Sequence, residues 1–86
     1  MSKVVLITGG SSGIGRAIAT YINEKNNYVV YGSSRNIKKL DDVAFFPVEL
    51  DVTSEKSIND CIEKIIQEQG KIDILIATDV AARGLD

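Results

Sequence analysis

The sequence of 86 residues predicts an α/β half-domain of three layers, in which a four-stranded parallel sheet of strand order 3-2-1-4 lies between helices. Two observations support this fold class. Short apolar runs alternate with segments of helical period, as they do where helical crossovers join parallel strands. The apolar runs are continuous, as expected for strands buried on both faces. The sheet reverses its direction of growth after the third strand, so the first two helices should cover one face and the third helix the other.

Seven elements alternate along the chain, and each is marked by its own apolar pattern. Val4 begins a continuous apolar strand, and Ile14 begins a helix whose apolar residues recur at spacings of three and four. The second strand should close at Gly32, and helical spacing returns from Ile58. In chain order, the elements are expected at residues 4–7 (strand), 14–22 (helix), 28–31 (strand), 36–40 (short helix), 44–50 (strand), 54–69 (helix) and 72–77 (strand).

Capping and turn residues mark where these elements end. Asn26 can end the first helix, because asparagine tolerates a left-handed backbone. Thr53 or Ser54 can cap the third helix, and Gly70 is well suited to end it. Pro47 has no backbone N–H to donate within a sheet, so the third strand is expected at an edge.

Composition indicates a single domain over residues 1–86 and excludes several kinds of chemistry. A net charge of −2 argues against a general nucleic-acid binder, which needs a basic surface. Cys61 is the only cysteine and histidine is absent, so the sequence offers no internal disulfide, no ordinary zinc site and no histidine acid–base chemistry. No apolar stretch approaches the roughly 20 residues of a membrane span, and the first residues do not resemble a signal peptide. We therefore expect a soluble, cytoplasmic protein.

A glycine-rich turn, Thr-Gly-Gly-Ser-Ser-Gly-Ile-Gly at residues 8–15, joins the first strand to the first helix. This arrangement suits phosphate binding, because unpaired backbone N–H groups and the helix dipole face the anion. A purely structural turn is the alternative, but its glycines cost chain entropy that a plain turn would not require. The candidate phosphate-binding residues are Gly9, Ser11, Ser12, Gly13, Ile14 and Gly15.

The pattern Thr8-Gly9-x-x-x-Gly13-Ile14-Gly15 resembles the cofactor motif of the short-chain dehydrogenases/reductases. The resemblance extends over residues 3–76, since residues 71–76 are similar to that family's fourth strand and residues 50–52 to its adenine-side motif. It implies a Rossmann-like half-domain that binds a dinucleotide. It also implies that Asp51 accepts a hydrogen bond from the adenine amine and that the backbone of Val52 assists. A solvated acid near the helix is the alternative reading of Asp51.

The loop after the second strand indicates which dinucleotide is preferred. An NAD site usually places an acidic residue about 20 positions beyond the glycine motif to hold the ribose 2′-OH. The loop Gly-Ser-Ser-Arg-Asn at residues 32–36 has no acid, and Arg35 offers a fork of donors that suits a 2′-phosphate. Ser12 and Ser34 can add hydroxyl donors. We therefore expect weak binding of NADP in preference to NAD, with an exposed loop charge as the alternative role for Arg35.

The resemblance ends at Ala77, where the family continues with an Asn-Asn-Ala-Gly-like segment, a serine and a Tyr-x-x-x-Lys that protonates the substrate carbonyl. The tyrosines Tyr21, Tyr28 and Tyr31 all lie before the fourth strand. The one Tyr-x-x-x-Lys spacing in the chain, Tyr21 with Lys25, therefore falls near the end of the first helix and not after the fourth strand, where the family has it. Without a general acid, no dehydrogenase reaction is expected. The sequence therefore predicts a half-domain that binds a dinucleotide but is not an enzyme and has no catalytic residue.

Residues 77–86 instead resemble the fifth conserved motif of the DEAD-box RNA helicases. That resemblance implies that Thr78 would touch an RNA phosphate and Asp86 an ATP ribose. The Walker, Asp-Glu-Ala-Asp and arginine-finger motifs are missing, so helicase activity is not expected. Two families in one chain suggest a recombined or engineered chimera, in which residues 77–86 form a tail that completes the fold.

Two other functions stay open at this point. One is a structural fold chimera with no retained ligand binding, and the other is a weak ATP or RNA-phosphate binder that uses the tail. We also expect a homodimer through the fourth-strand edge, because Ile74, Leu75 and Ile76 would be poorly covered there.

Overall fold

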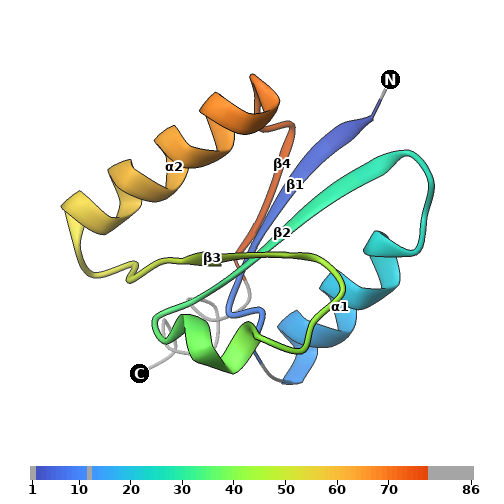
Figure 1. Ribbon diagram of the computed structural model, residues 1–86, viewed down its shortest axis with the longest axis horizontal. Helices are drawn as coiled ribbons and strands as arrows, with labels where there is room; N and C mark the ends of the chain where they lie inside the picture. Colours follow the sequence, from blue (N-terminus) through green and yellow to red (C-terminus); the bar gives the residue numbers. More distant parts are fainter. Residues whose placement is uncertain (1, 12, 78–86) are drawn as a thin grey trace.

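The computed structural model describes residues 2–11 and 13–77, and it confirms the expected α/β fold. A four-stranded parallel sheet of order β3-β2-β1-β4 lies between α2 on one face and α1 with the short helix η1 on the other (Figure 1). The elements are β1 (Lys3–Thr8), α1 (Gly13–Asn23), β2 (Tyr28–Ser34), the 3-10 helix η1 (Ile37–Leu40), β3 (Phe46–Glu49), α2 (Glu55–Gln69) and β4 (Ile74–Ala77).

The strand β1 lies at the centre of the sheet, with β2 on one side and β4 on the other. Leu6 pairs with Tyr31 of β2 and with Leu75 of β4, and all of these pairings are parallel. On the outer side of β2, Gly32 pairs with Pro47 of β3, which has no further neighbour within the described sheet. The prediction that Pro47 lies in an edge strand is therefore confirmed.

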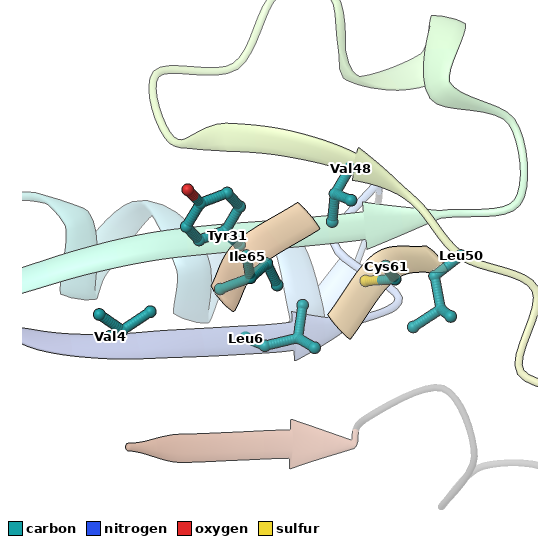
Figure 2. Close-up of a cluster of buried hydrophobic side chains, with 7 residues drawn as sticks. All are labelled: Val4, Leu6, Tyr31, Val48, Leu50, Cys61 and Ile65. Atoms are coloured by element: carbon teal, nitrogen blue, oxygen red, sulfur yellow. The ribbon is translucent and has the colours of Figure 1, made fainter. Parts of the chain in front are cut away.

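Successive residues of β1 point to opposite faces and enter two separate cores. Leu6 belongs to the cluster beneath α2, which Figure 2 shows with Cys61 and Ile65 of that helix above the sheet. Ile7 belongs to the cluster beneath α1 and η1. Each fully buried aliphatic side chain contributes about 1.5–3 kcal/mol through removal from water. The cluster under α2 comprises Val4, Leu6, Tyr31, Val48, Leu50, Cys61 and Ile65, and the one under α1 comprises Val5, Ile7, Ala19, Val30, Leu40 and Phe45.

The caps that the sequence predicted are present at three helix ends. Ser54 is the N-cap of α2, and its Oγ accepts a hydrogen bond from the backbone N–H of Ser57 at 3.2 Å. Gly70 ends α2 in the left-handed conformation, with φ of 83°, and its N–H donates to the carbonyl of Ile66. Asn36 caps η1 through a hydrogen bond from the N–H of Lys38 to its Oδ1.

Three strand boundaries differ from the sequence prediction by two residues or more. The strand β2 does not close at Gly32 but continues to Ser34, because residues 32–34 pair with residues 47–49 of β3. The strands β3 and β4 are shorter than expected and begin at Phe46 and Ile74. Ahead of β4, Asp73 extends the contact with β1: its N–H donates to the Val4 carbonyl, and its Oδ2 accepts from the Val4 N–H at 2.7 Å.

The described residues contain no membrane-spanning helix and do not include most of the helicase-like segment. Within them, no helix has the length and apolar character needed to cross a lipid bilayer. The helicase-like residues, Thr78 and Asp86 among them, lie outside the described residues.

Candidate cofactor-binding site

A cavity of about 270 Å³ opens at the carboxyl ends of β1, β2 and β3, which lie toward the same end of the sheet (Figure 1). This is where ligands bind in open parallel sheets, because the loops that leave adjacent strands diverge there. The volume is close to the lower end of the range for small-molecule pockets, about 300 to 1,000 Å³. The lining residues are Thr8, Gly9, Ser11, Ser33, Ser34, Arg35, Asn36, Lys39, Leu50, Asp51, Val52 and Thr53.

The glycine turn forms one wall of this cavity through conformations that favour glycine. Gly9 has a φ of 70° and Gly13 a φ of 61°, both in the left-handed region. Gly10 packs tightly against β2: its N–H donates to the Ser33 carbonyl at 2.7 Å, and a Cβ on it would lie 3.1 Å from the Gly32 Cα. The turn is therefore held directly onto the end of the neighbouring strand.

The helix α1 starts from this turn and suits an anion at its N-terminus. Its first turn carries no acidic side chain, so nothing of negative charge competes there with a phosphate for the backbone N–H groups. Gly15 is buried, whereas Ile14 is 74% exposed. These two residues and Gly13 stand at the start of α1 and are not among the residues that line the cavity. Ser12 lies outside the described residues.

Arg16, which the sequence analysis did not single out, ties the glycine turn to the segment that follows η1. Its Nη1 donates to the carbonyl of Ser11 at 3.4 Å, and its Nη2 forms an ion pair with Asp42 Oδ1 at 3.0 Å. No sequence pattern signals this contact, because Arg16 and Asp42 are 26 positions apart.

The loop after β2 forms the basic side of the cavity. Arg35 is exposed, and Ser34 is buried at the strand end with its Oγ accepting a hydrogen bond from the Asn36 N–H at 3.2 Å. That hydroxyl can still donate one hydrogen bond. Lys39 joins Arg35 in the lining although the sequence analysis passed over it. The only signal for Lys39 was its position one helical turn beyond Asn36.

Asp51 also lines the cavity and is held in a local turn. Its Oδ1 accepts from the Thr53 hydroxyl at 2.6 Å and from the Thr53 N–H at 2.9 Å. These hydrogen bonds, and then the positive charge of Arg35, lower the pKa of the Asp51 carboxyl. Asp51 is thus an ionised acceptor at neutral pH. Its backbone N–H is already engaged, because it donates to Ser57 Oγ at 2.8 Å.

The structure thus brings six of the sequence-predicted residues into one cavity: Gly9, Ser11, Ser34, Arg35, Asp51 and Val52. They come from three loops that the parallel topology brings together. The cavity thus combines the glycine turn, the basic side chain of Arg35 and the ionised carboxylate of Asp51.

Comparison with known proteins decides the family. A family model described as short chain dehydrogenase matches residues 3–81. The chain belongs to the short chain dehydrogenase family. It carries that family's NAD(P)-binding Rossmann fold. The match also includes the first residues of the segment that we compared with helicases, so the proposed family junction at residue 77 receives no support.

Individual members of the family match over most of this chain. A 3-ketodihydrosphingosine reductase from Bacteroides thetaiotaomicron is 40% identical over 78 residues, which cover 86% of this chain and 27% of that protein. The solved structure of ElxO with NADP bound matches with a TM-score of 0.80 at 34% identity, over 91% of this chain and 35% of that one. A 3-ketoacyl-(acyl-carrier-protein) reductase from Brucella melitensis, complexed with NADH, matches with a TM-score of 0.77 at 29% identity, over 85% of this chain and 32% of that one.

The expectation that this chain is not an enzyme is wrong at the level of its family. The family is one of dehydrogenases, and the matched relatives named above include two reductases. The chain spans about a third or less of the length of these relatives. Within these 86 residues, no serine and no Tyr-x-x-x-Lys follow the fourth strand as they do in the family. This says nothing about the reaction, because most of the relatives' length lies outside these residues.

Proposed function

We propose that this chain supplies the NADP-binding part of an oxidoreductase, and that Arg35 selects NADP by binding its 2′-phosphate. The observation that carries the proposal is the place of Arg35: it lines the cavity at the carboxyl end of β2, in a loop without an acidic residue. A guanidinium binds phosphate through two parallel hydrogen bonds, whereas a carboxylate there would repel it.

The other candidate residues fit the remaining parts of the cofactor. The glycine turn and the start of α1 would hold the diphosphate, through Gly9, Ser11, Ser12, Gly13, Ile14 and Gly15. Asp51 and Val52 would hold the adenine, and Ser34 would add a donor beside Arg35. When bound, the cofactor would donate a hydride in its reduced form, NADPH, or accept one in its oxidised form. The residues of this chain bind and orient it, and we expect an affinity in the micromolar range or weaker.

A second proposal concerns self-association through β4. Among the described strands, β4 pairs only with β1, so one edge has no strand partner there. Leu75 is 62% exposed on that strand, and Ile74 and Ile66 are also exposed. A second copy would cover this apolar surface through a twofold contact, which is the commonest symmetry of homo-oligomers. Thr78 and Asp86, on which the alternative of ATP or RNA-phosphate binding depends, lie outside the described residues.

Titration calorimetry with NADP and with NAD tests the cofactor proposal. The change of Arg35 to Gln should weaken NADP binding about 10- to 100-fold, which corresponds to the loss of a charge-assisted hydrogen bond, and should leave NAD binding nearly unchanged. Lys38→Gln is the matched control, since it removes one positive charge from the adjacent helix η1 at a residue that does not line the cavity. Equal losses for both dinucleotides would show that Arg35 does not bind the 2′-phosphate.

A further inference from the structure

A second basic side chain, besides that of Arg35, lines the cavity. Lys39 lines the cavity together with Arg35 and Asn36, although four positions separate it from Arg35 in the chain. Lys38, its neighbour on the same short helix, does not line the cavity. The two lysines are alike in charge and both are exposed, so their orientation is what distinguishes them.

The position of Lys39 is set by the backbone of η1. Its N–H donates to the Asn36 carbonyl at 3.0 Å, which closes one turn and stacks Lys39 over Asn36. The next residue, Leu40, is only 1% exposed and packs in the core beneath α1. Figure 1 shows η1 directly after the carboxyl end of β2. Lys39 is thus presented toward the cavity from an anchored turn.

The charge of Lys39 is available to a ligand. Within the described ranges, neither Lys39 nor Arg35 forms an ion pair. Asp42, an acid close to Lys39 in sequence, is held by Arg16. Asp51 lines the same cavity and interacts with the charge of Arg35. Lys39 adds a positive charge that no described carboxylate contacts.

A phosphate monoester carries more negative charge than one guanidinium neutralises. Its charge at pH 7 is about −1.5 to −2, and its three oxygens accept hydrogen bonds. One guanidinium supplies a single positive charge and a planar fork that engages two oxygens. An ammonium on a flexible stem can reach the third.

We infer that Lys39 is a second specificity-determining residue, which binds the 2′-phosphate of NADP together with Arg35. This inference rests on the proposed function, because it assumes that the 2′-phosphate occupies the basic side of the cavity. It adds the claim that selectivity is shared between two elements, the end of β2 and the helix η1.

The test uses the full chain and two probes that differ only by the 2′-phosphate, 2′,5′-ADP and 5′-AMP, in titration calorimetry. Lys39→Gln should weaken the binding of 2′,5′-ADP about fivefold, the effect of one exposed charge pair near contact, and leave 5′-AMP unchanged. Lys38→Gln should change both by less than about twofold, because a charge directed away from the ligand is largely screened. Lys39→Arg should retain the preference for 2′,5′-ADP.

The outcomes separate the two proposals. If the unmodified chain binds both probes equally, the proposed function fails and the inference fails with it. If Arg35→Gln removes the preference but Lys39→Gln behaves like Lys38→Gln, only the inference is overturned. A selective loss with Lys39→Gln that higher salt diminishes supports it. Circular dichroism of each variant confirms that the fold is retained, as expected for exposed residues.

Discussion

Two side chains flank Leu6 in the sheet, Tyr31 on β2 and Leu75 on β4, and their surroundings differ sharply. Tyr31 is 1% exposed and Leu75 is 62% exposed. Tyr31 lies in a strand with neighbours on both edges, whereas Leu75 lies in a strand that pairs only with β1 in the described sheet. Tyr31 and Leu75 thus pair with the same residue of β1, but Tyr31 is buried in the core and Leu75 lies on the surface.

Tyr31 also connects the sheet to the helix above it. Its hydroxyl donates to Glu68 Oε1 at 2.5 Å and accepts from Gln69 Nε2 at 3.2 Å, both near the end of α2. Burial and the hydrogen bond with Glu68 raise the pKa of the Tyr31 hydroxyl, so it stays protonated and can donate at neutral pH. Figure 2 shows the Tyr31 ring beside Ile65 of α2.

The comparison explains where the cavity can form. The described residues that line it come from the ends of β1, β2 and β3 and from the segments after them, and none comes from β4. The β2 side has both faces covered and a fixed register, so it can hold loops in place. The β4 side has exposed apolar residues and, among the described strands, no further neighbour at its edge, which suits a partner surface rather than a polar ligand.

The largest predicted difference comes from truncating these paired residues. Tyr31→Ala should lower the free energy of unfolding by about 4 kcal/mol, because it removes a buried ring and leaves a cavity. Leu75→Ala should lower it by less than about 1 kcal/mol, because the side chain is already exposed. Urea denaturation followed by circular dichroism measures both. Similar losses would show that β4 is covered as well as β2.

If Tyr31→Ala does not fold, Tyr31→Phe replaces it in the comparison with Leu75→Ala, with a smaller expected loss of stability. It keeps the ring and removes only the hydroxyl, so the expected loss is about 1 kcal/mol.

The second comparison is between Gly32 on β2 and Ile76 on β4, the two residues that pair with Ile7 of β1. A Cβ at Gly32 would lie 2.2 Å from the Phe45 ring, which is 2% exposed. Gly32→Val should therefore destabilise the fold by about 3 kcal/mol through overpacking. Ile76→Val should cost less than about 1 kcal/mol, because it removes one methylene at a half-buried site. A small loss of stability for Gly32→Val would mean that the Phe45 ring can repack.

The third prediction tests the open edge. Leu75→Lys should weaken self-association about tenfold or more, because it places a charge at the centre of the apolar surface. Ile37→Lys, a change of the same type at an exposed residue of η1, is the control and should have little effect. Size-exclusion chromatography with light scattering over a range of concentrations gives both values. A chain that remains monomeric at hundreds of micromolar would refute the dimer.

The smallest predicted effect concerns Asp73, which joins the start of β4 to β1. The hydrogen bond from the Val4 N–H, followed by the contact with Lys71, lowers the pKa of the Asp73 carboxyl in the folded chain. A lowered pKa means that the ionised group stabilises the fold above the unfolded value, about 3.9, and that this stabilisation is lost as pH falls through the folded value.

Asp73→Asn should therefore lower stability near pH 7 and make less difference at pH 3. Asparagine can still accept from the Val4 N–H but carries no charge for Lys71. Asp60→Asn, in an exposed ion pair with Lys56, is the control. Urea denaturation at several pH values tests this, and a constant difference across pH would contradict it.

Local patterns in the sequence were enough to predict most of the fold. Apolar period distinguishes strands from helices, and Ser54 and Gly70 act on the backbone within a few residues of themselves, so these features are visible without tertiary contacts. The order 3-2-1-4 follows from right-handed crossovers, which apply to any chain with this alternation. The glycine turn and Arg35 were recognisable as candidate site residues because each lies directly after a predicted strand.

The tertiary structure decided what depends on residues distant in the chain. The extension of β2 through Gly32, Ser33 and Ser34 could not be predicted, because these residues resemble a turn until β3 pairs with them. Gly32 is required there by the ring of Phe45. Lys39 joins the cavity only because Leu40 anchors η1 in the core. Sequence patterns report local backbone preference, whereas register and packing arise when separate segments compete for the same space.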